Sequence, residues 1–250
     1  DLYLTDLSAP ALETLAAGLR AAYGVRVRHR PCDLTSAEDR SAFFQNLEEE
    51  KLTFHTLINV AGGDFEGPFL EQSRQRIRTL LRLNIEGTLE LTHALLHRRD
   101  PRRPFHILNT ASLAAFYPMP VKASYAASKR FLLDFSLALR EELRGLGATV
   151  TVLCPAGMPT TPETIEAIDA QGWAGLLTTR NTGSVAAQAL NAAMRGQAVV
   201  VPGAVNQFLR LAGGLLPPRL LAWMIGSRWR LAWQRRREAA AQAAAWGAAR

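Results

Sequence analysis

The sequence contains few cysteines, no long uncharged apolar run and no recognisable leader. Cys32 and Cys154 are the two cysteines in 250 residues, and both lie beside apolar runs that predict buried strands, which excludes a disulfide framework. No stretch reaches the roughly 18 uncharged apolar residues that a membrane-spanning helix needs. Residues 1–6 predict a strand and lack the basic start of a signal peptide. These absences favour a cytoplasmic protein.

Basic residues outnumber acidic ones, with 29 Lys+Arg against 22 Asp+Glu and a formal net charge of +7. Such a balance can indicate a nucleic-acid partner or an anionic membrane. Much of the excess lies in arginine clusters within 98–103 and 228–237, which we interpret as a solvated surface. We therefore predict no nucleic-acid partner.

Length and composition predict one large α/β domain, because 250 residues with 48% hydrophobic content can bury a sizeable core. Short apolar runs alternate with helical patterns, which is typical of βαβ units in a doubly wound parallel sheet. The predicted strands are 2–5, 25–29, 56–60, 105–109, 149–154 and 198–201. The predicted helices are 11–22, 37–50, 72–97, 125–146 and 185–194.

The composition changes after Val205, which divides the chain into a predicted domain, 1–205, and a C-terminal extension, 206–250. In the extension, apolar and aromatic residues such as Trp223 and Trp229 alternate with arginines. An interfacial helix needs this pattern, because rings enter the headgroup boundary while guanidinium groups meet phosphates. A helix packed on the domain or on a second subunit would use the same residues, so both interpretations stay open.

Tyr125 and Lys129 lie four positions apart on a predicted helix and therefore project from the same face. A phenol is a poor base at neutral pH, but a nearby ammonium group favours the phenolate and lowers the pKa. The spacing alone is common on amphipathic helices. Ser112 adds context, because it follows the predicted strand 105–109 at the end where ligands bind in open α/β sheets.

The runs Asn-Thr-Ala-Ser at 109–112 and Tyr-Ala-Ala-Ser-Lys at 125–129 resemble the active-site segment of the short-chain dehydrogenase/reductase family. The resemblance extends in order over nearly the whole chain and implies a Rossmann-like fold. It implies that Tyr125 is the general acid/base, that Ser112 orients the substrate and that Lys129 also binds the nicotinamide ribose. Asn84 matches the asparagine that holds a water in the proton relay of that family.

The resemblance also implies cofactor contacts. Asp33 and Leu34 match the segment that contacts adenine. Residues 59–62 resemble an Asn-Asn-Ala-Gly element with Val60 replacing the second asparagine, and 155–160 resemble the segment beside the nicotinamide with Ala156 replacing a glycine. With the two catalytic residues that also contact the cofactor, the predicted set is Asp6, Asp33, Leu34, Asn59, Ala61, Gly62, Tyr125, Lys129, Pro155, Ala156, Met158 and Thr160.

Asp6 ends the first predicted strand, where the family places the residue that selects the cofactor. A carboxylate there accepts hydrogen bonds from both adenosine ribose hydroxyls and repels a 2′-phosphate. No arginine follows directly in the sequence. We therefore expect NAD to be favoured over NADP, although an aspartate after a strand is also an ordinary turn residue.

A dinucleotide fold needs a glycine-rich turn between its first strand and first helix, where backbone N–H groups hold the pyrophosphate. The sequence contains no such turn, so 2–5 corresponds to the second strand of the family. We expect an incomplete record or a truncated form of a longer enzyme. The alternative is a catalytically inactive homologue that acts as a membrane- or protein-binding module.

The predicted function is hydride transfer between a nicotinamide cofactor and a carbonyl or secondary alcohol, with Tyr125 exchanging the proton. No metal site is predicted. Apolar residues near the expected pocket favour a small apolar substrate, although such residues also serve as lid packing; they are Leu113, Phe116, Tyr117, Met158 and Trp173. By resemblance, a homodimer or homotetramer is expected.

Overall fold

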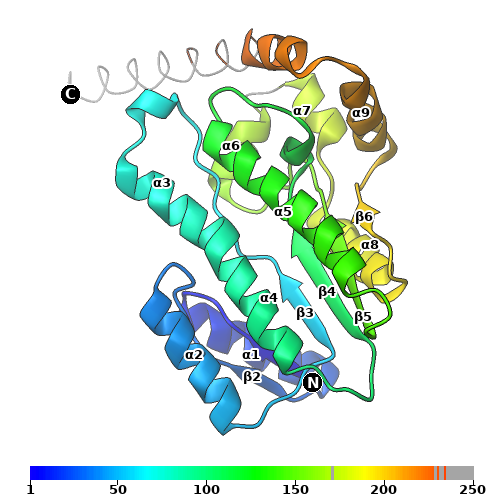
Figure 1. Ribbon diagram of the computed structural model, residues 1–250. Helices are drawn as coiled ribbons and strands as arrows, with labels where there is room; N and C mark the ends of the chain where they lie inside the picture. Colours follow the sequence, from blue (N-terminus) through cyan, green and yellow to red (C-terminus); the bar gives the residue numbers. More distant parts are fainter. Residues whose placement is uncertain (170–171, 228–229, 231–233, 235–250) are drawn as a thin grey trace, which may run out of the picture.

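A computed structural model of the chain describes residues 1–169, 172–227, 230 and 234. All strands of the described part run parallel (Figure 1). They are β1 (Leu2–Leu4), β2 (Val27–His29), β3 (Thr56–Asn59), β4 (Phe105–Thr110), β5 (Ala148–Leu153) and β6 (Val199–Val200). Each corresponds to a predicted strand, so the parallel α/β fold predicted from the sequence is confirmed.

The strands form two separate sheets, β1-β2 and β3-β4-β5-β6. No strand of the described residues joins β1 to β3, so each has one edge without a paired strand. Side chains near these edges are exposed although they are apolar, with exposed fractions of 44% for Leu2, 44% for Ile58 and 64% for Val60. The sheet is therefore interrupted between the N-terminal β-strand pair and the rest of the fold.

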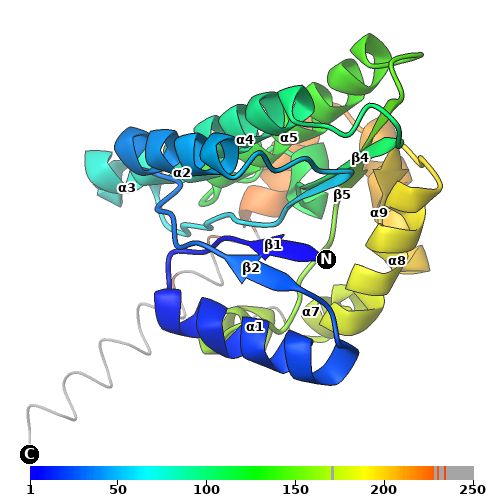
Figure 2. The ribbon, with the colours of Figure 1, turned by 90° about the horizontal axis from the view of Figure 1, so that it is seen from below.

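Helices cover both faces of the sheets (Figure 2). On one face lie α2 (Ala37–Glu49), α4 (Gly87–His97) and α5 (Ala123–Glu142), and on the other lie α1 (Ala9–Tyr23), α7 (Trp173–Thr178) and α8 (Thr182–Met194). Ser8 and Ser36 cap the first two helices by accepting hydrogen bonds from backbone N–H groups. Each strand is thus followed by a helix that returns the chain to the same end of the sheet.

The predicted helix 72–97 is interrupted in the structure. It consists of α3 (Arg74–Leu81), a π-helical turn, η2 (Arg82–Glu86), and α4. A π turn inserts one residue into an α-helix. The sequence pattern does not reveal it, because residues 82–86 contain no glycine or proline that would mark an interruption. Asn84 lies within this turn, and π turns are frequent at functional sites.

The main core lies between β3, β4, β5 and the helices α2 and α4. Its centre contains Phe105, Ile107 and Val150, none of which is more than 1% exposed. Cys32 and Cys154 are both buried free thiols, in line with the prediction that the chain has no disulfide framework. The central strands β4 and β5 are therefore the most rigidly packed part of the fold.

Two further helices are α6 (Pro162–Asp169), which follows β5, and α9 (Ala204–Leu215), which follows β6 and leads to a helical segment at 218–227. Short 3-10 turns are η1 (Phe69–Glu71) and η3 (Leu113–Phe116). The buried amide of Asn206 donates to the carbonyls of Thr178 and Pro202, and Gly213 lies so close to Tyr117 that a Cβ would collide with its ring. The predicted boundary after Val205 falls inside α9, which packs on the domain.

Within the described residues, none of the helices has the length and apolar character required to cross a membrane. Trp229 and Trp233 of the predicted extension lie outside the described residues.

Candidate active site

Tyr125 and Lys129 lie one turn apart near the start of α5. The Nζ atom of Lys129 is 5.8 Å from the centre of the Tyr125 ring and donates a hydrogen bond of 3.0 Å to the carbonyl of Thr110. Lys129 is only 4% exposed. The helix thus presents a phenol and an ammonium group side by side at the C-terminal end of β4.

Ser112 reaches the same place from β4. Its backbone is extended, and it caps η3 by accepting a hydrogen bond of 3.1 Å from the N–H of Ala114. Its side chain also hydrogen-bonds to that of Tyr125, which favours the phenolate and opposes the rise in the tyrosine pKa. The structure therefore brings together the three residues that the sequence predicted as the centre of the site.

Asn84 joins this group from the π turn. Its side chain accepts a hydrogen bond from the N–H of Gly63 (2.8 Å) and donates to the carbonyl of Gly63 (3.0 Å) and the hydroxyl of Ser128 (2.9 Å). Ser128 in turn donates to the carbonyl of Tyr125. Asn84 is fully buried, so in this arrangement it fixes the loop after β3 to the helix that carries Tyr125.

Burial disfavours the charged forms of both Tyr125 and Lys129. It raises the pKa of Tyr125 to about 12, with a smaller contribution from Asp64, and it lowers the pKa of Lys129 to about 8. The prediction that Lys129 lowers the pKa of the tyrosine is wrong for the structure. Removal from water is the largest cause of both pKa shifts, because it disfavours the charged form of each group.

The two cysteines are unsuited to nucleophilic chemistry. Burial raises the pKa of Cys154 to about 12 and that of Cys32 to about 11, so both remain thiols near neutral pH. The described residues also contain no cluster of three or more His, Cys, Asp or Glu side chains that could hold a metal ion.

The two predicted acidic cofactor contacts follow β1 and β2. Asp6 is exposed and accepts a hydrogen bond of 3.0 Å from the N–H of Ser8. Asp33 accepts two hydrogen bonds of 2.8 Å from the N–H and hydroxyl of Thr35, and the carbonyl of the buried Leu34 accepts one from Arg40. Both loops leave polar atoms at the C-terminal edge of the β1-β2 sheet.

Asn59 is a buried core residue in the structure. Its amide nitrogen donates to Asn109 (2.8 Å) and Thr92 (3.1 Å), while Asn109 donates to Ser136 (2.9 Å). This network joins β3, β4 and the helices α4 and α5. The side chain of Asn59 is therefore occupied in the core, and its predicted role in cofactor binding now rests on its backbone.

The loop after β3 starts close to the catalytic residues. A Cβ placed on Gly62 would lie 3.0 Å from the Nζ of Lys129 and 3.2 Å from the Oδ1 of Asn84. Only glycine allows the backbone to approach these two groups so closely. Ala61 and Gly62 are exposed, so this stretch remains accessible to a ligand.

Residues 155–160 follow β5 and lie beside Ser112, whose hydroxyl is 3.5 Å from the carbonyl of Pro155. Pro155 is buried, Ala156 is half-buried and Thr160 is exposed. The side chain of Met158 packs against the core cluster that includes Leu108, rather than standing free. The segment thus offers backbone and small side chains next to the catalytic serine.

The structure describes the side chains of four of the five apolar residues expected near a substrate. Leu113 and Phe116 pack against the core beside β5, and the buried hydroxyl of Tyr117 has no hydrogen-bond partner among the described residues. The side chain of Trp173 lies outside the described part of the structure.

Sequence reasoning missed a charged group beside the site. Lys122 forms ion pairs with Asp64 and Glu66, and its Nζ is 5.7 Å from the centre of the Tyr125 ring. The carboxylates precede the lysine by more than fifty residues, so no local spacing in the sequence could reveal the cluster.

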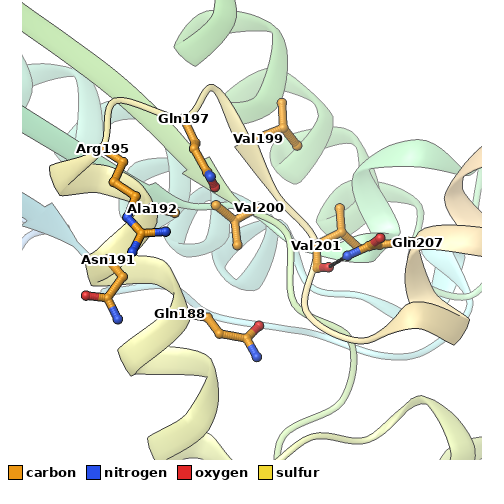
Figure 3. Close-up of a pocket in the computed structure, with 9 residues that line it drawn as sticks. All are labelled: Gln188, Asn191, Ala192, Arg195, Gln197, Val199, Val200, Val201 and Gln207. Carbon is orange, nitrogen blue, oxygen red and sulfur yellow. Dashed lines mark hydrogen bonds between the residues drawn. The ribbon is translucent and has the colours of Figure 1, made fainter.

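A separate pocket of about 360 Å³ lies beside β6 at the edge of the sheet (Figure 3). Amide side chains and one arginine surround it: Gln188, Asn191, Arg195, Gln197 and Gln207. None of the predicted site residues lines this pocket, so it is distinct from the catalytic group.

Comparisons with known proteins identify the family of the chain. Residues 1–172 match the sequence model of the family described as short chain dehydrogenase. The chain is 30% identical over 161 residues to a ketoacyl reductase, HetN, of Nostoc sp., covering 64% of this chain and 56% of that protein. It is 30% identical over 154 residues to a very-long-chain 3-oxoacyl-CoA reductase of Phaeosphaeria nodorum, covering 60% of this chain and 45% of that protein. The chain thus spans about half the length of these curated relatives.

Solved structures show the same fold. A short-chain dehydrogenase from Sphingobium yanoikuyae in complex with NADPH superimposes with a TM-score of 0.70 at 27% identity, over 86% of this chain and 83% of that one. A 7beta-hydroxysteroid dehydrogenase superimposes with a TM-score of 0.80 at 18% identity, over 90% and 86% of the two chains. At that identity the second likeness concerns the fold alone.

Proposed function

Because the chain belongs to the short-chain dehydrogenase/reductase family, we propose that it catalyses hydride transfer between a nicotinamide cofactor and a carbonyl or secondary alcohol. One observation carries this proposal: Ser112, Tyr125 and Lys129 converge at the C-terminal end of β4, with Asn84 connected to them through Ser128. Perturbed pKa values, such as those of Tyr125 and Lys129, are typical of active sites.

In the proposed reaction, the hydroxyl of Tyr125 gives its proton to the substrate oxygen during reduction and takes it back during oxidation. With a pKa of about 12, Tyr125 remains protonated at neutral pH, which suits reduction. The hydroxyl of Ser112 hydrogen-bonds to the same oxygen and orients it. Lys129 supplies the nearby positive charge, and Asn84 keeps the loop and helix in register.

The residues fit the two ends of a nicotinamide dinucleotide. When bound, such a cofactor supplies or accepts a hydride at the nicotinamide ring. Lys129, the exposed backbone at 61–62 and the segment 155–160 would hold the nicotinamide end, while Asp6, Asp33 and Leu34 would hold the adenosine end. The turn from β1 to α1 is Asp6-Leu7-Ser8 and has no glycine, so the described residues include no cradle for the pyrophosphate.

The preference for NAD over NADP is part of the proposal. The carboxylate of Asp6 is exposed just after β1 and can accept hydrogen bonds from ribose hydroxyls. It would repel the additional phosphate of NADP. The relative from Sphingobium yanoikuyae carries NADPH, so a direct comparison of NADH and NADPH as reductants is the measurement that decides this point.

The substrate that we propose is an apolar carbonyl compound of the 3-oxoacyl type. The half-buried Leu113 and Phe116 follow Ser112 on η3 and offer apolar surface close to the reacting position. The curated relatives named as ketoacyl and 3-oxoacyl-CoA reductases support this class. A series of ketones of increasing chain length would test it, with kcat/KM expected to rise with length.

The decisive experiment is Tyr125→Phe in the full chain, with oxidation of NADH or NADPH by a ketone as the readout. Removing the proton donor is expected to lower kcat by about 10²- to 10⁴-fold. Tyr117→Phe is the matched control, because it removes a nearby buried hydroxyl that has no partner among the residues the structure describes. Substantial turnover by Tyr125→Phe, or an equal loss in both variants, would contradict the assignment.

We also propose a homodimer or homotetramer that pairs through the outer faces of the helices bearing the site. Phe131 and Leu137 on α5 are 39% and 37% exposed, and the rings of Phe131 and Phe135 stack 6.1 Å apart. Light scattering of the wild type and of Phe131→Arg would test this, with a loss of the larger species expected in the variant.

A second candidate function is peripheral contact with a membrane by a cytoplasmic protein. On α9, Phe208, Leu211 and Leu215 recur at helical spacing and are 69%, 67% and 86% exposed. Trp223 in the next helical segment is 66% exposed, and Arg219 is exposed nearby. Apolar rings beside guanidinium groups suit an anionic lipid surface.

Flotation with vesicles that contain phosphatidylserine would test this contact. The double variant Phe208→Ser and Leu215→Ser is expected to remain unbound where the wild type floats. Leu70→Ser is the control, because Leu70 is 97% exposed but lies on η1. Equal flotation of all three proteins would rule out α9 as the membrane-binding surface.

A further inference from the structure

Lys122 occupies an unusual position next to the catalytic tyrosine. It directly precedes α5, its side chain is 11% exposed, and it forms ion pairs with Asp64 and with Glu66, the latter at 3.4 Å. The sequence is rich in arginine but has three lysines, and two of them, Lys122 and Lys129, lie beside the ring of Tyr125. A lysine in this position does more than keep the protein surface hydrated.

Both carboxylates belong to the loop that follows β3, residues 62–68. The first residues of this loop are held by the catalytic group, because Asn84 binds the N–H and carbonyl of Gly63. Its far end is held by the segment before α5, because the N–H of Gly67 donates a hydrogen bond of 2.8 Å to the carbonyl of Val121. The ion pairs of Lys122 lie between these two attachments.

Val121 adopts a backbone conformation that β-branched residues rarely take, with a φ of 70°. Such strain persists only where surrounding contacts fix the chain, and it is concentrated at functional sites. Here it directs the carbonyl of Val121 to Gly67 and places Lys122 against the two carboxylates. The local strain therefore serves the connection between the loop and α5.

We propose that Lys122 is a positioning residue, which clamps loop 62–68 to α5 and compensates the charge of Asp64 beside Tyr125. This inference rests on the proposed function and adds to it a residue that holds the site in shape. The aliphatic part of the side chain is buried, so the ion pairs are shielded from solvent more than an exposed pair would be.

The charges around Tyr125 support the second part of the proposal. Loop 62–68 contributes the carboxylates of Asp64 and Glu66. The ammonium groups come from Lys129 on α5 and from Lys122 just before it. Ser112 reaches the hydroxyl of Tyr125 from the end of β4. The buried Cys154 interacts electrostatically with Lys129 and Arg210. Asp64 raises the pKa of both Tyr125 and Lys129. Without Lys122, the phenolate of Tyr125 would form only at higher pH.

The test combines hydrogen exchange with kinetics on the full chain. Lys122→Gln removes the clamp and the charge, and Lys122→Arg keeps the charge. The double variant Asp64→Asn and Lys122→Gln removes the clamp but leaves no uncompensated carboxylate at position 64. Arg130→Gln is the matched control, because it breaks an exposed ion pair with Asp134 on the same helix.

In Lys122→Gln, amide exchange within 62–68 is expected to accelerate about tenfold. The fall in kcat/KM for carbonyl reduction near pH 8, which reports Lys129, is expected to move to higher pH, because an uncompensated Asp64 raises the pKa of Lys129. The double variant should keep the fast exchange but recover the wild-type pH profile. Lys122→Arg and Arg130→Gln should match the wild type in both measurements. If Lys122→Gln folds poorly, Asp64→Asn breaks the same pair from its more exposed partner.

Unchanged exchange in Lys122→Gln would overturn the clamp, and an unchanged pH profile would overturn the charge compensation. These outcomes differ from failure of the proposed function. Absence of nicotinamide-dependent turnover in the wild type would refute the proposed reaction, whereas the exchange measurement would still decide whether Lys122 holds the loop.

Discussion

The catalytic corner and the N-terminal β-strand pair are held together in opposite ways. The catalytic corner comprises the C-terminal ends of β4 and β5 with Ser112, Tyr125 and Lys129. There β4 and β5 are flanked by strands on both sides, and Val152 and Cys154 are fully buried. In the N-terminal pair, β1 and β2 are three residues long, and the candidate ligand group Asp6 lies in an exposed turn. Groups that exchange protons are thus fixed by packing, whereas groups that would recognise adenosine are fixed by short turns.

This difference matters because the two tasks need different precision. Proton transfer requires heavy atoms within hydrogen-bond reach, and displacement of about 1 Å can cost a factor of about 100 in rate. Recognition of a flexible ribose tolerates more movement. The rigid network of Asn84, Ser128 and the loop after β3 therefore lies at the catalytic corner.

A buried arginine with two ion pairs connects the two regions. Arg40 on α2 is fully buried, and it donates to Glu90 and Glu86 on the helical layer of the larger sheet and to the carbonyl of Leu34. Arg40→Met is expected to lower the free energy of unfolding by about 2 to 3 kcal/mol, less than for a fully enclosed pair because both carboxylates are partly exposed. Urea denaturation measures this directly.

Arg130→Met provides the reference for that experiment, since its ion pair with Asp134 is exposed on both sides. We expect it to cost less than about 0.5 kcal/mol. Equal effects of the two substitutions would show that Arg40 does not join the two regions energetically.

The titration of Lys129 in the catalytic corner should make the rate of carbonyl reduction depend on pH. Lys129 has a pKa of about 8, so it is charged below that pH and loses its proton as the pH rises through it. Tyr125 stays protonated until about pH 12. The kcat/KM for carbonyl reduction is therefore expected to fall above pH 8, approaching about tenfold per pH unit. A profile that stays level to pH 10 would contradict this role of Lys129.

The smallest effect is expected from the N-terminal pair. Asp6→Ala removes a carboxylate that would bind the ribose hydroxyls, and it should raise the KM for NADH about fivefold, the equivalent of about 1 kcal/mol. Stability should change by less than about 0.5 kcal/mol, because Asp6 is exposed. Asp1→Ala is the control from the same sheet, since Asp1 forms an exposed ion pair with Arg26. A similar rise in the KM for NADH in both variants would contradict the proposal that Asp6 binds the ribose hydroxyls.

Most strands and helices could be predicted because burial imposes a period on the sequence. The short apolar runs around Ile107 and Val150 mark central strands, and the four-residue spacing of Tyr125 and Lys129 marks one helical face. The ends of helices depend on caps that periodicity does not fix: the helix predicted to begin at 185 begins at Thr182 and is capped by Asn181.

Interactions between distant segments could not be predicted in the same way. Arg40 looks like an ordinary solvated residue of an amphipathic helix, and only the fold buries it against Glu90. The clamp of Lys122 depends on a loop more than fifty residues away in the sequence. The direction of the Tyr125 pKa shift was also missed, because the spacing reveals a neighbouring charge but not the loss of water around both groups.

The interruption of the sheet between β1 and β3 has a practical consequence for handling the protein. Unpaired strand edges with apolar neighbours such as Leu2 and Ile58 are templates for strand addition between molecules. The chain is therefore expected to self-associate as its concentration rises, and a peptide able to form a parallel strand should suppress precipitation. Turbidity followed against concentration, with and without such a peptide, would reveal this tendency.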